Sequence, residues 1–179
     1  MSRMFKEGIY QWESRKFIGE GSFGKVYKGK NTKTREDVAV KVLDLRHFSP
    51  KDMVSLKNEI QVMKLLNSDN VVHMLDCFSS PKETYIFMEY CEGGDLRKYI
   101  TEKNGKLPEK QAITILHQVM LGLQEVYQKG YMHRDIKPEN ILLSKNTFKI
   151  ADFGFATKIH PRGRQLLKEF VGTPLYMAP

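Results

Sequence analysis

The chain has 179 residues, of which 41% are hydrophobic and 28% are charged, and its formal net charge is +8 at pH 7. This composition is typical of a globular protein, and the length suits one domain or two small lobes. No apolar run approaches the ~20 residues that a membrane span needs, and the N-terminus lacks the apolar core of a secretory signal. Two cysteines, Cys77 and Cys91, are too few for a disulfide framework, which favours a reducing, cytoplasmic location.

The positive charge raises the question of nucleic-acid binding. The excess is spread over both halves of the chain, and the longest basic stretch without an acid, residues 158–168, is a single segment. Neither a basic helical face nor an interleaving of aromatic and basic residues accompanies it. We therefore expect no nucleic-acid partner. A basic nucleic-acid module is an alternative that these patterns do not favour.

The first half of the chain is predicted to form strands with one helix among them. The helix starts at Ser49, since a serine cap, Pro50 at the first helical position and an acid at Asp52 are typical of a helix N-terminus. Apolar residues follow at roughly helical spacing: Val54, Leu56, Ile60, Met63 and Leu66. The segments with strand character are 17–18, 25–28, 38–43, 71–78 and 85–90.

After Gly93 and Gly94, the best candidate linker, the pattern becomes helical. A long helix is predicted from Pro108 to Gln128, and Gly130 ends its pattern. Its recurring apolar residues are Ile113, Leu116, Val119, Met120, Leu123, Val126 and Tyr127. Two short strands, 141–143 and 148–150, follow.

Residues 19–26 form a glycine-rich segment of pattern G-x-G-x-x-G-x-V. Without side chains at Gly19, Gly21 and Gly24, the backbone can lie close over phosphates and point its N–H groups at them. The same spacing suits dinucleotide-binding folds and ordinary turns, so alone it does not distinguish nucleotide binding from these alternatives. The next segment is predicted to be a strand rather than a helix, which disfavours the dinucleotide alternative.

Lys41 lies on the apolar strand predicted at 38–43, where an ammonium is costly to bury unless an anion meets it. Glu59 on the predicted helix is the natural partner, and the ammonium would remain able to contact phosphate. The alternatives are a lysine that reaches solvent from a strand edge and a solvated helix glutamate.

The strongest pattern is His133-Arg134-Asp135-Ile136-Lys137-Pro138-Glu139-Asn140, followed by Asp152-Phe153-Gly154. Asp135 can accept a hydroxyl proton, and Lys137 can stabilise charge that develops during phosphoryl transfer. Asn140 and Asp152 offer the hard oxygen ligands that suit Mg²⁺. Each of these residues alone is more often a surface group, but their combination downstream of the glycine-rich segment indicates phosphoryl transfer.

With these motifs, residues 12–179 resemble a eukaryotic protein kinase. The resemblance implies an α+β, two-lobed fold with a complete, small, β-rich N-lobe and only the first part of the helical C-lobe. It implies an N-terminal extension at 1–11, an N-lobe at 12–90, a hinge at 91–94 and a partial C-lobe at 95–179. Because the family continues past Met-Ala-Pro, we expect a fragment whose long helix leaves an apolar face partly uncovered.

The resemblance also implies roles at the site. Lys41 would hold the α- and β-phosphates of ATP and pair with Glu59, while Asp135 would be the catalytic base, with Thr173 bridging it to Lys137. Asn140 and Asp152 would hold Mg²⁺. The residues expected to contact the nucleotide are Ile18, Gly19, Glu20, Gly21, Ser22, Phe23, Gly24, Val26, Ala39, Lys41, Met88, Glu89, Cys91, Asp95 and Leu142. An apolar spine that couples the lobes would contain Met63, Met74, His133 and Phe153.

Lys137 and the segment 172–179 resemble the serine/threonine branch of the kinases. Residues 90–96 and 151–156 look most like the autophagy-initiating kinases, although Aurora-like and calcium/calmodulin-dependent kinases share much of this pattern. The expected function is transfer of the γ-phosphoryl group of ATP to Ser/Thr hydroxyls of protein substrates, in autophagy signalling. The alternative is a nucleotide-binding fragment or pseudokinase-like regulatory module without activity, against which the complete motif set weighs.

Two hypotheses go beyond the shared motifs. Glu169 lies four residues before Thr173, where related kinases carry a phosphothreonine, and we expect it to replace that phosphate by pairing with Arg134. The alternative is a solvated loop glutamate. Asp95 and Glu139 match positions that receive a substrate arginine in basophilic kinases, so we expect a modest preference for upstream basic residues. Asp95 is equally suited to cap the helix that begins at Leu96.

Overall fold

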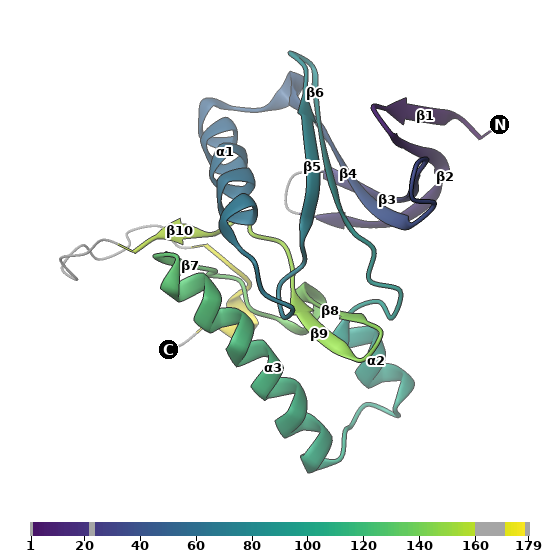
Figure 1. The fold of residues 1–179 in the computed structure, drawn as a ribbon. Coiled ribbons are helices and arrows are strands. Elements are labelled where there is room, and N and C mark those ends of the chain that lie inside the picture. Colours follow the sequence, from purple (N-terminus) through teal and green to yellow (C-terminus); the bar gives the residue numbers. More distant parts are fainter. Residues whose placement is uncertain (1, 22–23, 160–170, 178–179) are drawn as a thin grey trace.

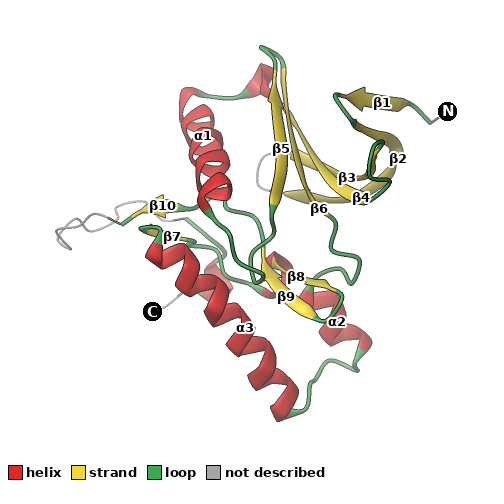
Figure 2. Cartoon of the chain, in the orientation of Figure 1, coloured by secondary structure: helices red, strands yellow, loops and turns green. Residues whose placement is uncertain are grey.

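The computed structural model describes residues 2–21, 24–159 and 171–177 (Figure 1). A curled sheet with one helix forms the upper lobe, and helices with short strand pairs form the lower lobe (Figure 2). The upper elements are β1 (Met4–Glu7), β2 (Tyr10–Gly21), β3 (Gly24–Asn31), β4 (Asp37–Asp44), α1 (Pro50–Leu65), β5 (Met74–Ser79) and β6 (Glu83–Glu89), with a 3-10 turn at Leu45–His47. The lower elements are α2 (Leu96–Glu102), α3 (Glu109–Gln128), β7 (Tyr131–Met132), β8 (Ile141–Ser144), β9 (Thr147–Ile150) and β10 (Thr157–Lys158), with 3-10 turns at Pro138–Asn140 and Pro174–Tyr176. The predicted α+β, two-lobed fold is confirmed.

The upper sheet has the order β1-β2-β3-β4-β6-β5, and each neighbouring pair is antiparallel. Side chains of β4 alternate between its two faces, as strand geometry requires. Val38 and Val40 join an aromatic cluster on one face, whereas Leu43 belongs to the core that α1 shares. Lys41 has the same parity as Leu43, so strand periodicity alone directs its side chain toward α1.

The first residues form part of the sheet rather than a separate extension. Strand β1 pairs with the start of β2, with Met4 opposite Glu13 and Glu7 opposite Tyr10. Phe5 stacks on Trp12 with ring centroids 5.6 Å apart, and Tyr10 stacks on Phe87 at 4.0 Å. The sequence prediction missed this strand because it is short and carries no apolar run.

Helix α1 begins as predicted. The Ser49 hydroxyl accepts a hydrogen bond from the Asp52 backbone, and the Asp52 carboxylate accepts one from the Ser49 backbone, which completes a capping box. The predicted apolar face is only partly correct. Val54 is 58% exposed, whereas the buried residues are Leu56, Glu59, Val62 and Met63. Glu59 therefore lies on the core side of the helix, and the alternative of a solvated glutamate is wrong.

The strand predicted at 71–78 begins later, at Met74. Residues before it are bonded to the lower lobe: Val72 N–H donates to the Ile150 carbonyl, and Ile150 N–H donates to the Asn70 carbonyl, both at 2.9 Å. The Asn70 side chain also donates to the Phe148 carbonyl at 3.0 Å. The segment between α1 and β5 thus belongs to the β9 edge rather than to the upper sheet.

Helix α3 has the predicted extent, but its apolar residues are divided between two faces. Its buried residues are Ile115, Val119, Gly122 and Val126. A Cβ at Gly122 would lie 2.5 Å from the Asn70 carbonyl oxygen, so glycine is required for this close approach. The residues of the other apolar face are each more than half exposed: Ile113, Leu116, Met120 and Tyr127. We call these four residues the α3 stripe.

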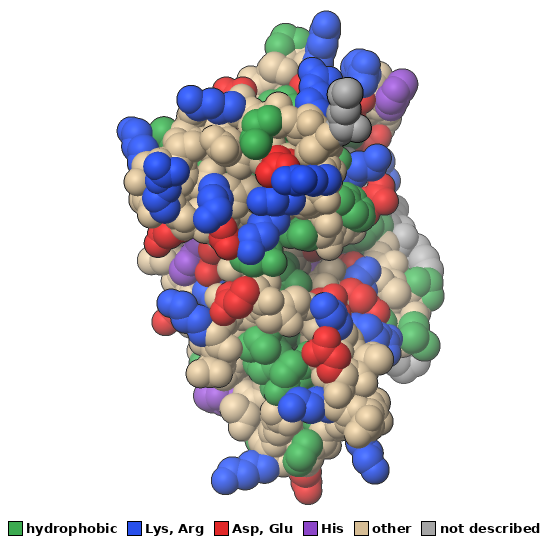
Figure 3. Space-filling model, turned by 90° about the vertical axis from the view of Figure 1, so that its right-hand side faces the viewer, with side chains coloured by type: hydrophobic (Ala, Val, Ile, Leu, Met, Phe, Trp, Pro, Cys, Tyr) green, Lys and Arg blue, Asp and Glu red, His purple; other side chains and the backbone are tan. Residues whose placement is uncertain are grey.

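Several charged side chains on the upper lobe form ion pairs. Figure 3 shows Lys and Arg interspersed with Asp and Glu over this lobe. The Lys28 ammonium lies 2.7 Å and that of Lys30 3.4 Å from the Asp37 carboxylate, and Arg15 lies 2.6 Å from Glu13. Across the described residues, we find no helix long and apolar enough to cross a membrane.

We predict that Trp12→Ala lowers the free energy of unfolding by about 3 kcal/mol or more, since it empties a site in the aromatic cluster. Trp12 is only 4% exposed and contacts Phe5, Tyr85 and Phe87. Urea unfolding followed by circular dichroism measures the effect. The matched control is Phe17→Ala, because Phe17 is half exposed. Equal losses for the two variants would contradict the prediction.

We predict that the 179-residue chain self-associates through the α3 stripe, because none of the described residues covers it. Leu116→Lys combined with Met120→Lys should shift the sedimentation profile toward the monomer. The control is Thr114→Lys, which adds a charge at an exposed position of the same helix outside the stripe. An unchanged profile for the double variant, or an equal shift for the control, argues against association through this face.

Candidate active site

A buried ion pair joins the upper sheet to α1. The Lys41 ammonium lies 2.5 Å from Glu59 Oε1 and 3.5 Å from Asp152 Oδ1, and the side chains of Lys41 and Glu59 are 5% and 1% exposed. Burial alone would lower the pKa of Lys41, but the carboxylates of Glu59 and Asp152 outweigh burial and raise it. Lys41 is therefore a charged ammonium held by two acids, and the alternative of a lysine that reaches solvent is wrong.

A third carboxylate of this region is Asp135, in the loop that follows β7. Its Oδ1 accepts a hydrogen bond from the Thr173 hydroxyl at 2.7 Å, and its Oδ2 lies 2.9 Å from the Lys137 ammonium. The Lys137 ammonium also donates to the Thr173 hydroxyl at 2.9 Å. Thr173 thus bridges Asp135 and Lys137, which joins the loop to a segment almost 40 residues later.

Asn140 holds the same loop from within. Its amide nitrogen donates to the Asp135 carbonyl at 2.9 Å and to the Asp135 carboxylate at 3.0 Å. Burial opposes ionisation of Asp135, but hydrogen bonds from Lys137 and Thr173 outweigh burial and lower its pKa. Asp135 is therefore a carboxylate, an acceptor only, at neutral pH.

The glycine-rich segment is a hairpin rather than an open turn. Gly21 at the end of β2 pairs with Gly24 at the start of β3. A Cβ at Gly24 would lie 2.4 Å from the Val42 carbonyl oxygen, so strand packing requires this glycine, whereas nothing lies within 4 Å of a Cβ at Gly19. A Cβ at Gly21 would lie 3.5 Å from the Lys41 ammonium and 3.9 Å from an Asp152 oxygen. Only Gly21 keeps space open beside these charges.

The other residues expected at the nucleotide belong to both lobes. Ile18, Gly19 and Glu20 lie on β2, and Ser22 and Phe23 fall outside the described residues. Val26 on β3 is opposite Lys41, and Ala39 on β4 is opposite Met88 on β6. Leu142 on β8 forms an isolated bridge with Asp95, so these two residues are neighbours. Burial raises the pKa of the Cys91 thiol to about 12, which keeps it protonated.

The residues expected to form the apolar spine lie close to one another. The rings of His133 and Phe153 lie 5.0 Å apart at 64°. Phe153 and Met63 belong to the core that spans both lobes, and Met74 packs against it.

Glu89 has contacts that the sequence prediction missed. Its carboxylate accepts hydrogen bonds from the His73 backbone at 2.7 Å and from the buried Lys149 ammonium at 3.0 Å. Next along the chain, Glu92 accepts from the Lys145 backbone at 2.6 Å. The sequence does not reveal such pairs, because most glutamates and lysines lie on solvated surfaces.

The Gly93–Gly94 segment is likewise bonded to β8. Gly93 N–H donates to the Leu143 carbonyl at 2.9 Å, and Leu143 N–H donates to the Gly94 carbonyl at 2.8 Å. A Cβ at Gly93 would lie 2.7 Å from Leu143, so this glycine permits close packing. The glycine pair predicted as a linker is thus fixed to the lower lobe.

The donor set near Asp152 fits Mg²⁺ bound together with phosphate. Among the described residues, no group of three or more His, Cys, Asp or Glu could hold a metal ion. The side chains of Asn140 and Asp152 contain oxygens of the kind that Mg²⁺ prefers, and Mg²⁺ sites in nucleotide enzymes commonly combine one or two such ligands with phosphate oxygens and water. The Asn140 amide nitrogen is engaged by Asp135, which leaves its oxygen as the atom to offer a cation.

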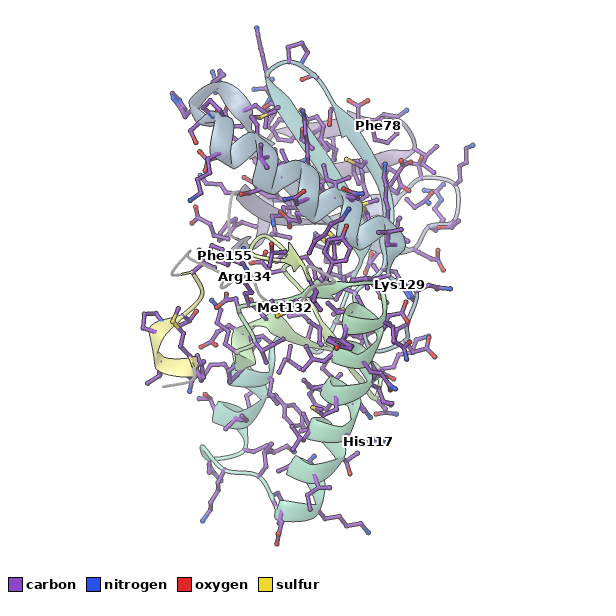
Figure 4. The ribbon with its side chains drawn as sticks, turned by 90° about the vertical axis from the view of Figure 1, so that its left-hand side faces the viewer. Phe78, His117, Lys129, Met132, Arg134 and Phe155 are labelled. Atoms are coloured by element: carbon purple, nitrogen blue, oxygen red, sulfur yellow. The ribbon has the colours of Figure 1, made fainter. Side chains whose placement is uncertain are left out.

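The partner expected for Arg134 lies outside the described residues. Glu169 belongs to that part, so its pairing with Arg134 stays a prediction. Arg134 has a positive φ of 70°, and its Nε donates to the Phe155 carbonyl at 2.7 Å (Figure 4). A Cβ at Gly172 would lie 2.4 Å from the Arg134 carbonyl oxygen, so Gly172, directly before Thr173, lies against this loop.

Several known proteins are similar to this sequence over almost its full length. Serine/threonine-protein kinase ATG1c of Arabidopsis thaliana is 39% identical over 90% of the chain, and atg1 of Dictyostelium discoideum is 42% identical over 98%. Serine/threonine-protein kinase 36 of Pongo abelii is 42% identical over 90%. The chain spans only 22%, 27% and 12% of the length of these relatives, respectively.

A family model described as the protein kinase domain matches residues 12–179, which include Lys41, Glu59, Asp135, Asn140 and Asp152. The chain therefore belongs to the protein kinase domain family.

Proposed function

We propose that this chain carries the phosphoryl-transfer site of a serine/threonine protein kinase. The observation that carries the proposal is the convergence of Asp135, Lys137 and Thr173 through contacts of 2.7 to 2.9 Å. The relatives are serine/threonine-protein kinases by name, and the family uses ATP with Mg²⁺. The protein substrate would supply the serine or threonine hydroxyl.

In the proposed reaction, the substrate hydroxyl oxygen forms a bond to the γ-phosphorus while the bond between that phosphorus and the ADP oxygen breaks. The hydroxyl proton passes to the Asp135 carboxylate, which lines a cavity together with Thr173 and is already ionised. Lys137 stabilises the negative charge that develops on the transferred group. Lys41, kept cationic by Glu59, contacts the phosphates of ATP. Magnesium held by Asn140 and Asp152 would neutralise phosphate charge.

His133 supports the position of Asp135. The Asp135 backbone N–H donates to His133 Nδ1 at 3.2 Å, and His133 Nε2 lies 3.0 Å from the Ala151 carbonyl. These partners assign the proton to Nε2 of a neutral imidazole, because Nδ1 has to accept and a carbonyl has to receive. Burial lowers the pKa of His133, which favours the same neutral form. The ring therefore acts as a fixed bridge between the Asp135 loop and the backbone beside Asp152.

We predict that Asp135→Asn reduces phosphate transfer at least about a hundredfold, because it removes the proton acceptor. ATP affinity should stay within about twofold, since Lys41 and Asp152 are unchanged. Incorporation of labelled γ-phosphate into a generic Ser/Thr protein measures transfer by the full-length gene product, and Mg²⁺-dependent thermal stabilisation by ATP measures binding.

The matched control for this substitution is Asp69→Asn, at an exposed position outside the site. Transfer that survives Asp135→Asn would reject the proposed base. ATP-dependent stabilisation without any transfer by the unsubstituted protein would support the alternative of a nucleotide-binding module.

We predict that stability falls as the pH drops from 7 to 5.5. The folded state keeps His133 neutral, whereas the unfolded chain takes up a proton as the pH passes its ordinary pKa near 6.5. The free energy of unfolding should therefore decrease toward low pH, by at most about 1.4 kcal/mol per pH unit for this one group. His133→Gln should flatten the slope in urea unfolding, while His117→Gln, at an exposed position, serves as the control. An unchanged slope in His133→Gln would count against a neutral, buried His133.

A further inference from the structure

Arg97 on α2 reaches two segments that are far away in the sequence. Its Nε donates to Glu139 Oε1 at 3.0 Å, and its Nη2 donates to the Tyr176 hydroxyl. These partners lie 42 and 79 residues further along the chain. One guanidinium thus links α2, the turn after Lys137 and the segment after Thr173. We call Arg97, Glu139 and Tyr176 the Arg97 cluster.

This cluster lies on the side of the site where a protein substrate would approach. Glu139 follows Lys137 by two residues, and Tyr176 follows Thr173 by three. Tyr176 lines a cavity of about 310 Å³ together with Asp135 and Thr173. The side chain that receives Arg97 therefore borders the same space as the carboxylate that would accept the substrate proton.

Both carboxylates expected to attract a substrate arginine are already engaged. Glu139 accepts from Arg97, and the Asp95 carboxylate accepts the Lys98 backbone N–H at 2.8 Å as the cap of α2. The Arg97 and Glu139 side chains are 52% and 43% exposed, and Arg97 binds Glu139 Oε1, so a second guanidinium must compete for this carboxylate with one that is tethered beside it. The tether keeps Arg97 at a high local concentration, and its positive charge repels an incoming arginine.

We propose that Arg97 is a specificity-determining residue that occupies the arginine subsite at Glu139 and so cancels selection for basic residues upstream of the acceptor hydroxyl. This inference rests on the proposed function, because Glu139 is part of a substrate subsite only if the chain acts on protein substrates. The sequence alone led us to expect a preference for upstream basic residues. That preference requires a Glu139 carboxylate that is accessible to the substrate, so the inference replaces it. The chain then accepts neutral or apolar side chains at the position where a basophilic kinase takes arginine.

The test is a binding measurement, so it does not depend on phosphate transfer. Fluorescence anisotropy with the full-length gene product compares an alanine-rich peptide with versions in which one arginine stands one to five residues before the acceptor position. The acceptor itself is replaced by alanine, which makes every peptide unreactive. For the unsubstituted protein we expect all the peptides to bind within about twofold of one another. In Arg97→Ala, one arginine position should gain about tenfold in affinity, the scale of a single charge-assisted pair.

Two further variants separate this role from a general effect of charge. Lys98→Ala removes a positive charge from the same helix without touching Glu139, and it should leave the peptide ratios unchanged. Glu139→Gln combined with Arg97→Ala should abolish the gained preference, because the acceptor carboxylate is gone. Circular dichroism confirms that each variant is folded.

Every outcome decides the inference. It is overturned if the unsubstituted protein already prefers an arginine peptide tenfold, if Arg97→Ala gains nothing, if Lys98→Ala gains equally, or if no peptide binds. Failure of the proposed function is distinguishable, because it would appear as absent or Asp135-independent phosphate transfer while the binding ratios of the arginine peptides still change with Arg97.

Discussion

The buried ion pair of Lys41 and Glu59 is the constraint on which the site depends. Two charges that are almost fully removed from water are tolerated only when each has its partner, because an uncompensated charge in the interior costs several kcal/mol. The pair therefore fixes α1 against β4, and through Asp152 it fixes the upper lobe against the segment that follows β9. A shift of α1 away from the sheet would leave an ammonium and a carboxylate buried without compensation.

The lower lobe fixes its own charges by a different means. Asp135 is held by Thr173, Lys137 and Asn140 through hydrogen bonds to both carboxylate oxygens. One of these donors, the Thr173 hydroxyl, comes from a segment almost 40 residues later. Asp135 therefore keeps all its hydrogen bonds only when that segment lies against its loop. The site thus has two halves, one maintained by a buried ion pair and the other by a hydrogen-bonded carboxylate, and both halves meet near Asp152.

Sequence reasoning found the residues whose chemistry is unusual for their surroundings. A lysine within an apolar strand and a glutamate on a capped helix predict each other, and the motif at 133–140 includes several partners that contact one another, such as Asp135 and Asn140. It could not find Arg97 with Glu139 or Lys149 with Glu89, because charged residues of these types are abundant and only the fold brings them together. It also placed part of the buried face of α1 wrongly. A small error in the rotation of the helix was enough to predict Val54, which is exposed, in place of Val62, which is buried. The prediction missed strand β1 because that strand has only four residues and carries no apolar run.

The β8–β9 hairpin receives both connections between the lobes. The segment 70–72 is bonded to β9, and the segment 89–94 is bonded to β8, β9 and the turn between them. A movement of the sheet over the lower lobe that keeps these hydrogen bonds would bend at the ends of β5 and β6, near Met74 and Met88, rather than at the glycine pair. The bend would then lie inside the upper lobe, while Gly93 and Gly94 stay bonded to β8 of the lower lobe.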